Sequence, residues 1–268
     1  MKKNSFTLIE LLVVIAIIVL ISSIVFVALG SAREKARIAK GLQFAASVHH
    51  ALGAEAVGVW EFDNNLNDSS GYNNNGSCTS CPAFINNTPS GKGWALNFTG
   101  SEYVDLANLP VNTSAGAKTT LAFWMYWKGG DSQMPLGWQG VYDLWLRANC
   151  FGFNTGQGNV LGVSSVGLKN KWVHVVAIFY NGVPSSQNNA LYVDGEKKEI
   201  WACLGTTTSS KSVTPQLRIS GYAGGSGYRF SGYIDDVRIY SQALSSAQIE
   251  QLYAQGARER GLAVSTAD

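Results

Sequence analysis

Glu10 is a carboxylate inside an otherwise apolar segment of membrane length. The other polar residues between positions 6 and 29 carry only hydroxyl groups. A charge near the centre of a bilayer costs about 2.5–3.5 kcal/mol on insertion scales, so such a residue is expected to have a partner. The residue types therefore predict that Glu10 meets a specific partner. The alternative is that Glu10 lies unpaired in the lipid headgroups.

Groups suited to catalysis are sparse. His49, His50 and His174 are not near a candidate Ser or Cys nucleophile in the sequence. No strand carries the close pair of carboxylates that glycoside hydrolysis needs. We therefore expect no catalysed reaction.

Four cysteines could form disulfides if the body of the chain lies outside the cytoplasm. Cys150 and Cys203 are expected to bridge two strands. Cys78 and Cys81, in "SCTSCP", could close a local ring, bind a metal or pair elsewhere. Disulfides are favoured over zinc, because the next donors are distant in sequence, and over redox activity, because no βα unit carries the CxxC.

A long N-terminal helix must position Glu10. The apolar segment 6–29 exceeds the roughly 20 residues that span a bilayer, and no small-residue cleavage site follows it. An apolar stripe at spacings of three and four then continues to about residue 56. One helix over 6–56 would be about 76 Å long, with a transmembrane half and an amphipathic half.

The sequence from residue 57 onward has short alternating segments separated by Gly, Asn, Ser and Asp, which is typical of antiparallel β-structure. At least nine such segments predict an all-β jelly-roll sandwich. A short helix is expected near the end, with Ser245 and Gln248 as a capping box and Gly256 as its stop. The expected organisation is a leader (1–5), the helix (6–56), the β-sandwich head (57–256) and a mobile tail (257–268).

The composition excludes a nucleic-acid-binding role for the head. The chain has 268 residues and a formal charge of +2, and Lys2 and Lys3 supply that excess. Only 14% of the residues are charged, and 29 are glycine. These values favour a turn-rich globular domain over a disordered or basic one.

The segment "MKKNS" followed by "FTLIELLVVIAI" resembles the N-terminus of type IV pilins and pseudopilins. The resemblance implies that a prepilin peptidase cuts between Ser5 and Phe6 and methylates the new amine. The family usually has Gly where this chain has Ser5. The resemblance also implies that Glu10 neutralises the N-terminal amine of a neighbouring subunit, which costs far less than burying either charge alone and fixes subunit register.

The segments "VWEFDNNLNDSSGYNNNG", "LAFWMYW", "NKWVHVVAIFYNG" and "FSGYIDDVRIYSQALSSAQIEQLY" resemble laminin-G-like, concanavalin A-like lectin domains. The resemblance implies a structural Ca²⁺ between the start of the domain and its last strand. Calcium prefers hard oxygen ligands. The candidate ligands are Asp63, Asn65, Asp68, Asp235 and Asp236, and the alternative is that these side chains only satisfy loop backbone as Asx turns.

Aromatic residues are the candidates for glycan contact. By the resemblance, Trp60, Trp94, Trp124 and Trp172 occupy core positions. Trp127, Trp138, Trp145 and Trp201 lie off those positions and are the predicted glycan-binding residues. The segment "LAFWMYWK" is apolar on both faces, so one face needs a ligand, a second packed layer or a subunit contact.

The sequence as a whole predicts a structural subunit of a type IV pilus-like filament with a lectin-like head for surface or glycan adhesion. Its expected partners are copies of itself, the inner-membrane assembly machinery and prepilin peptidase. It is expected in the inner or cytoplasmic membrane before assembly and in an extracellular filament afterwards. The alternatives are a pseudopilin of a secretion or DNA-uptake machine and a membrane-tethered polysaccharide enzyme.

Overall fold

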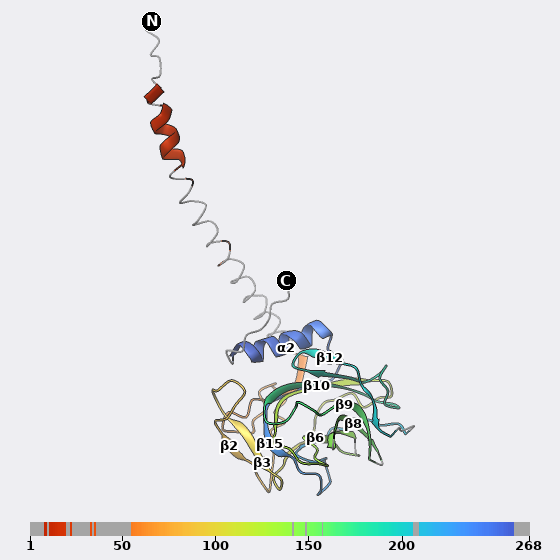
Figure 1. Cartoon of the computed structure of the whole chain (residues 1–268). Coiled ribbons are helices and arrows are strands. Elements are labelled where there is room, and N and C mark those ends of the chain that lie inside the picture. The colour runs from red at the N-terminus through yellow and green to blue at the C-terminus, as the bar shows by residue number, and fades with distance from the viewer. Residues whose placement is uncertain are drawn as a thin grey trace. The chain divides into compact units, whose positions relative to one another are not determined.

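The computed structural model describes residues 8–9, 11–19, 22, 33, 35, 55–140, 142–147, 149–156, 158–205 and 209–259. The chain divides into two compact units, residues 1–48 and 49–268. Figure 1 shows the helical N-terminal residues and the β-rich head.

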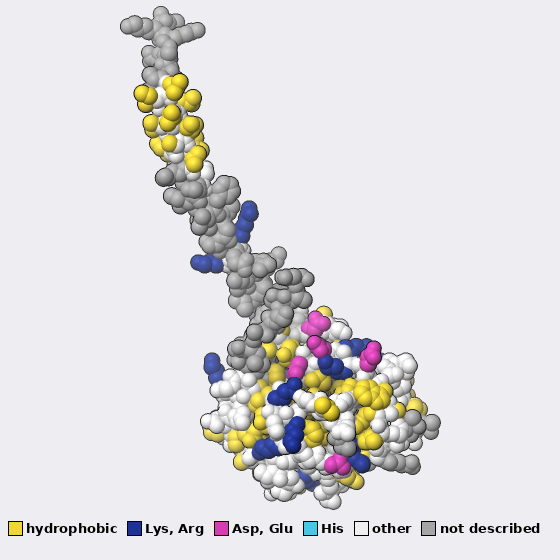
Figure 2. Space-filling model, in the orientation of Figure 1, with side chains coloured by type: hydrophobic (Ala, Val, Ile, Leu, Met, Phe, Trp, Pro, Cys, Tyr) yellow, Lys and Arg dark blue, Asp and Glu magenta, His cyan; other side chains and the backbone are white. Residues whose placement is uncertain are grey.

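The described residues of the N-terminal unit are helical, and those between positions 8 and 19 are all apolar. Residues 8–9 and 11–19 are helical, and the large side chains among them are 47–79% exposed. Figure 2 shows these side chains as almost entirely hydrophobic. Within the described part of the chain, no helix has both the length and the hydropathy to span a bilayer. Most of the predicted membrane segment 6–29 and its continuation to residue 54 lies outside the described residues.

Two antiparallel sheets form the head. The first sheet has eight strands in the order β12-β11-β10-β5-β15-β3-β2, with β1 paired to β15. Its strands are β1 (Ala56–Trp60), β2 (Ala83–Ile85), β3 (Ala95–Thr99), β5 (Lys118–Trp127), β10 (Trp172–Tyr180), β11 (Ala190–Val193), β12 (Glu196–Lys198) and β15 (Ser231–Tyr240).

The second sheet has seven strands in the order β13-β9-β8-β7-β6-β14-β4. Its strands are β4 (Val104–Leu106), β6 (Leu136–Trp138), β7 (Tyr142–Arg147), β8 (Cys150–Gly156), β9 (Asn159–Ser164), β13 (Trp201–Leu204) and β14 (Leu217–Ile219). The β-sandwich prediction is confirmed. The nine segments predicted as strands overlap β1, β3, β4, β5, β7, β10, β11, β14 and β15.

Alternation along the strands builds the core between the sheets. In β5, Phe123 and Met125 face the core, and in β7, Tyr142 and Leu144 do so. The intervening residues point to the outer face of each sheet, because successive side chains of a strand alternate. The core cluster draws on strands from both sheets, so the sandwich closes around one hydrophobic interior.

Helix α2 (Ser246–Glu259) covers part of the outer face of the eight-stranded sheet. The predicted capping box is present, since Ser245 N donates to Gln248 Oε1 at 2.9 Å and Gln248 N donates to Ser245 Oγ at 3.3 Å. The predicted stop at Gly256 is wrong, because the helix continues to Glu259. A Cβ at Gly256 would lie 3.1 Å from the Trp124 ring, so this glycine allows the helix to approach the sheet closely.

Candidate functional site

The residues predicted for processing and assembly are Ser5, Phe6 and Glu10. All three lie outside the described residues. Their predicted roles therefore stay predictions from the sequence.

The loop that follows β1 contains three of the predicted calcium ligands. Asp68 accepts hydrogen bonds from Val59 N and Ser70 N at Oδ1 and from Asn74 N at Oδ2, each at 2.9 Å. Burial acts to raise the pKa of Asp68, but the hydrogen bonds from Ser70, Val59 and Asn74 outweigh it and hold the pKa below its ordinary value. The carboxylate thus ties the loop to the backbone of β1.

Asp63 and Asn65 also bind backbone groups. Asp63 Oδ1 accepts from Trp94 N at 3.0 Å, and Asn65 Oδ1 accepts from Asn67 N at 2.8 Å. The Asn65 contact is an Asx turn, whereas Asp63 ties the loop to the backbone just before β3.

Asp235 and Asp236 lie at an irregularity in β15, where the register with β5 shifts between Asp235 and Arg238. Asp236 forms a bidentate ion pair with Arg238, at 2.8 and 3.2 Å. Although burial acts to lower the pKa of Arg238, the charge of Asp236 raises it above its ordinary value. Asp235 Oδ1 accepts from Asp236 N at 2.9 Å.

The structure places the two segments that carry the predicted calcium ligands next to each other but does not gather the ligands into one site. Strand β1 pairs with β15, with Trp60 opposite Val237, so the two ligand-bearing segments adjoin the same strand pair. Within the described part of the chain, no group of three or more His, Cys, Asp and Glu side chains could hold a metal ion. Both oxygens of Asp68 and of Asp236 already have protein donors. The calcium site therefore stays a prediction, and the observed contacts favour the turn-forming alternative for the loop.

Three of the four predicted glycan-binding tryptophans are buried. Trp138 is 0% exposed and packs edge-on against Phe179, with 6.0 Å between ring centroids. Trp127 belongs to the same core, and its Nε1 donates to Gln133 Oε1 at 3.2 Å. Trp145 is 5% exposed. The prediction that these rings lie at the surface is wrong, because strand alternation turns Trp127 and Trp138 inward and neighbouring groups cover Trp145.

Trp201 is the exception, with 51% of its surface exposed at the edge strand β13. Trp94 was expected in the core but is 42% exposed, just before β3. Trp172 is also partly exposed at the start of β10. Only Trp60 and Trp124 of the four expected core tryptophans are fully enclosed.

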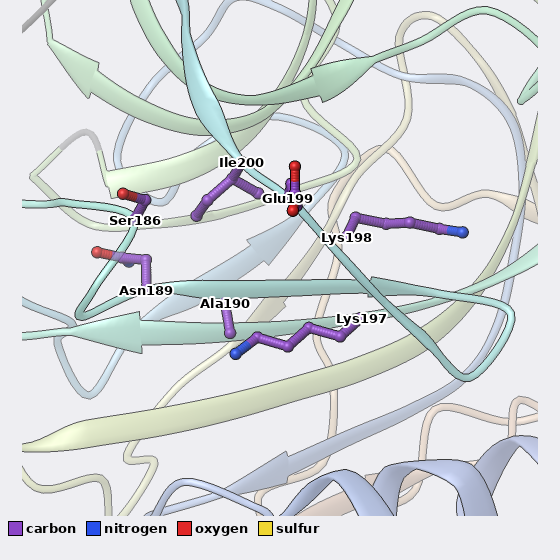
Figure 3. A pocket seen from close by; sticks show the side chains of 7 residues that line it. All are labelled: Ser186, Asn189, Ala190, Lys197, Lys198, Glu199 and Ile200. Atoms are coloured by element: carbon purple, nitrogen blue, oxygen red, sulfur yellow. The ribbon is translucent and has the colours of Figure 1, made fainter.

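A polar hollow lies between β11, β12 and the loop before β11 (Figure 3). It is lined by Ser186, Asn189, Ala190, Lys197, Lys198, Glu199 and Ile200. Two of its five polar side chains have partners within the head. Asn189 Nδ2 donates to Tyr142 Oη at 2.7 Å, and Lys198 Nζ forms an ion pair with Glu196 at 2.6 Å.

Asp143 is a buried acid that the sequence analysis did not single out. It points to the outer face of β7 and is 0% exposed. The segment that includes Gly221 and Tyr222 covers Asp143. This segment crosses the sheet at Gly137, where an added Cβ would lie within 3 Å of Asp143, Gly221 and Tyr222. Burial raises the pKa of Asp143 to about 7, although a hydrogen bond from Asn154 Nδ2 at 3.3 Å and the charge of Lys211 act in the opposite direction.

This acid does not make a hydrolytic site. Its hydrogen-bond and charge partners are an amide and an amine, whereas glycoside hydrolysis uses two carboxyl groups about 5–9.5 Å apart. The arrangement suits a buried polar support for the sheet.

Both cysteine pairs form disulfides. Cys78 is bonded to Cys81, and Cys150 is bonded to Cys203. The second bond joins β8 to β13, across the intervening β9. The predicted cross-strand disulfide is confirmed. Of the alternatives for Cys78 and Cys81, the structure contains the local ring.

Comparison with known proteins gives two family matches. Residues 98–250, more than half of the chain, match the model of the concanavalin A-like lectin/glucanases superfamily. Residues 1–26 match the prokaryotic N-terminal methylation motif. The search of curated proteins returns no match.

Several solved structures share the fold of the head. One is domain 4 of AbnA, an extracellular arabinanase from Geobacillus stearothermophilus, in complex with arabinotriose. It is 18% identical, with a TM-score of 0.52, over 75% of this chain and 98% of that one. Another is the ligand-binding domain of botulinum neurotoxin serotype D in complex with N-acetylneuraminic acid, 17% identical, with a TM-score of 0.51 over 76% of this chain and 51% of that one.

A third is the binding domain of botulinum neurotoxin DC in complex with rat synaptotagmin II. It is 14% identical, with a TM-score of 0.56 over 76% of this chain and 52% of that one. The chain thus spans about half the length of the neurotoxin domains. At these identities the likeness shows a shared fold.

Proposed function

Because the chain belongs to the concanavalin A-like lectin/glucanases superfamily and carries a prokaryotic N-terminal methylation motif, we propose that it is a type IV pilus-like filament subunit with a carbohydrate-binding head. The observation that supports this most is the fusion itself. One segment is of the kind that prepilin peptidase processes, and the other is of a lectin-like fold. The two parts have separate roles in the proposal.

The N-terminal helix serves anchoring and assembly. The precursor sits in the membrane through the apolar segment, prepilin peptidase cuts between Ser5 and Phe6, and the assembly machinery adds the mature chain to a filament outside the cell. In the filament, Glu10 of one subunit neutralises the Phe6 amine of a neighbour. Desolvating two charges is costly, so a subunit that lacks one partner would leave the other charge buried and unpaired.

The exposed apolar side chains of residues 8–19 support this assembly role. They cover every side of the described helical residues. A helix that is apolar all round needs a hydrophobic surrounding, which lipid provides before assembly and packed neighbouring helices provide afterwards. The same segment can therefore serve both states.

The head supplies recognition. Two of the solved structures with this fold are complexes with sugars, arabinotriose and N-acetylneuraminic acid. Adhesion to a glycan-bearing surface is the role that this fold best supports on a fibre. A pseudopilin role in secretion or DNA uptake is the second candidate, because the methylation motif is shared by both classes.

Replacement of Glu10 by Ala tests the assembly role. We expect a stable and processed subunit that stays in the membrane and does not enter filaments. Glu10→Asp, which keeps the charge on a shorter side chain, should retain partial assembly. Filaments of normal number and composition in the Glu10→Ala strain would contradict the role of Glu10.

A further inference from the structure

A row of three aromatic side chains crosses the outer face of the eight-stranded sheet. Trp172 on β10 lies opposite Tyr126 on β5, and Tyr126 lies opposite Tyr233 on β15. Asn97 on β3 continues the row next to Tyr233. Neighbours in sequence such as Val173, Met125 and Ile234 face the core, so the row itself faces outward.

The three rings form one compact group. Their centroids are 5.8 Å apart for Tyr126 and Trp172, 5.1 Å for Tyr126 and Tyr233, and 6.0 Å for Trp172 and Tyr233. All three side chains are partly exposed. We call Tyr126, Trp172 and Tyr233 the aromatic cluster.

Helix α2 packs on the adjacent row of side chains, and the aromatic cluster lies beside the area that the helix covers. The adjacent row is Trp124 and His174, which lie opposite each other two residues along the strands. Tyr253 of α2 packs on both rings, with centroids 6.0 Å apart in each case. The doubly apolar strand β5 thus has a packed cover over Trp124 but an accessible aromatic surface at Tyr126.

Polar side chains surround the cluster. Lys128 Nζ lies 4.2 Å from the centre of the Tyr233 ring and 3.3 Å from Asn97 Oδ1. Trp172 Nε1 donates to Asn87 Oδ1 at 3.3 Å. Aromatic faces beside amides and an amine are the groups that sugar rings and their hydroxyls require.

The local charge favours an anionic ligand. The amine of Lys169 lies near Gly129, the residue after Lys128, because a Cβ on Gly129 would come within 3 Å of that amine. The nearest acids along β3 and β15 keep their carboxylate oxygens in hydrogen bonds with other groups of the head. Glu102 accepts hydrogen bonds from Thr99, and Asp235 accepts one from a backbone amide. Lys128, whose amine lies against the Tyr233 ring, therefore complements a carboxylate or sulfate group.

We propose that the aromatic cluster, with Lys128, Asn97 and Asn87, is the binding surface for an acidic glycan. A pyranose ring stacks on Trp172 and Tyr233, and its acidic group meets Lys128. This inference rests on the proposed carbohydrate-binding function and names its site and ligand class. None of its residues is among the four tryptophans that the sequence predicted for glycan contact.

Binding by the full chain in detergent tests the proposal, with oligosaccharides of alginate and hyaluronan as acidic probes and dextran as the neutral probe. We expect Trp172→Ala and Tyr233→Ala each to weaken binding of the acidic probes roughly tenfold, about 1.4 kcal/mol, as for an anchoring aromatic residue. Tyr233→Phe keeps the ring and should stay within about twofold of wild type, by the same argument from ring contact. Lys128→Gln should abolish the preference for acidic probes over dextran, together with the salt dependence.

Tyr72→Ala is the matched control, because Tyr72 is 55% exposed and outside the cluster, and it should bind as wild type does. Thermal unfolding of each variant separates lost binding from lost folding. Wild-type affinity in the two alanine variants, or loss of binding on Trp201→Ala alone, would overturn the assignment of the cluster but keep a carbohydrate-binding head. Failure of the wild-type chain to bind any probe would contradict the head's proposed function as well. Unchanged binding with failed filament entry would reassign the cluster to a subunit contact and overturn the proposal.

Discussion

Asp143→Asn should make the head more stable at pH 8 and remove most of its pH dependence. In the folded state, burial raises the pKa of Asp143 to about 7, whereas the carboxyl titrates near 3.8 in its ordinary environment. Between these two values the folded state keeps the proton that the unfolded state has lost. The free energy of unfolding therefore falls as the pH rises through this window.

The size of the stability change follows from the shift in the pKa of Asp143. About three pKa units at roughly 1.36 kcal/mol each correspond to a loss of about 4 kcal/mol between pH 4 and pH 8. Asparagine has nearly the same shape but no charge, so the variant should be similar to wild type at pH 4 and more stable at pH 8 by up to about 4 kcal/mol. At about 2–4 °C per kcal/mol for a domain of this size, the melting temperature should rise by roughly 8–16 °C.

Thermal unfolding of wild type and Asp143→Asn at several values of pH between 4 and 8 measures this difference. Glu250→Gln is the control, because Glu250 is exposed on α2 and its replacement should not change how the melting temperature depends on pH. Parallel pH profiles for wild type and Asp143→Asn would contradict a raised pKa of Asp143 in the folded state. They would mean that water or a rearrangement relieves the burial of the carboxylate.

The other predictions concern packing and cross-linking. Trp138→Ala should lower the free energy of unfolding of the head by about 3–5 kcal/mol, as other large-to-small core changes do. Trp201→Ala, at the exposed edge, should change it by no more than about 0.5 kcal/mol. Equal effects of the two changes in chemical denaturation would argue against the burial of Trp138. Replacement of Cys150 and Cys203 by Ser should cost about 4 kcal/mol, because that bond closes a loop across a separation of 53 residues. The ring between Cys78 and Cys81, with a separation of 3, should contribute about 2 kcal/mol on the same scale, and a reversed order of the two losses would contradict the loop argument.

The strands were accessible from sequence where the hydrophobic alternation was strong. The nine predicted segments include β5, β10 and β15, which make up the centre of the eight-stranded sheet. Short or glycine-rich strands such as β8 and β9 were not predicted. Gly152 and Gly162 lie opposite each other in those strands, and a Cβ at either would collide with the neighbouring backbone. The glycines permit close strand approach, but they also weaken the pattern that reveals a strand.

The site residues were harder to predict, because side-chain exposure depends on contacts between distant segments. The inward direction of Trp138 depends on a strand of only three residues. Asp143 is buried because a segment near Tyr222 crosses above Gly137. The aromatic cluster requires the register of three strands that are separated by up to 107 positions, from Tyr126 to Tyr233. No local pattern contains this information.

Processing at the N-terminus is the most direct test of the filament account. Surface fibres should be sheared from cells and purified, and the first residue of this chain should be determined by mass spectrometry. We expect a mature chain that begins at Phe6 and carries a methyl group on its amine. Fibres without this chain, or a chain in them that still begins at Met1, would contradict it.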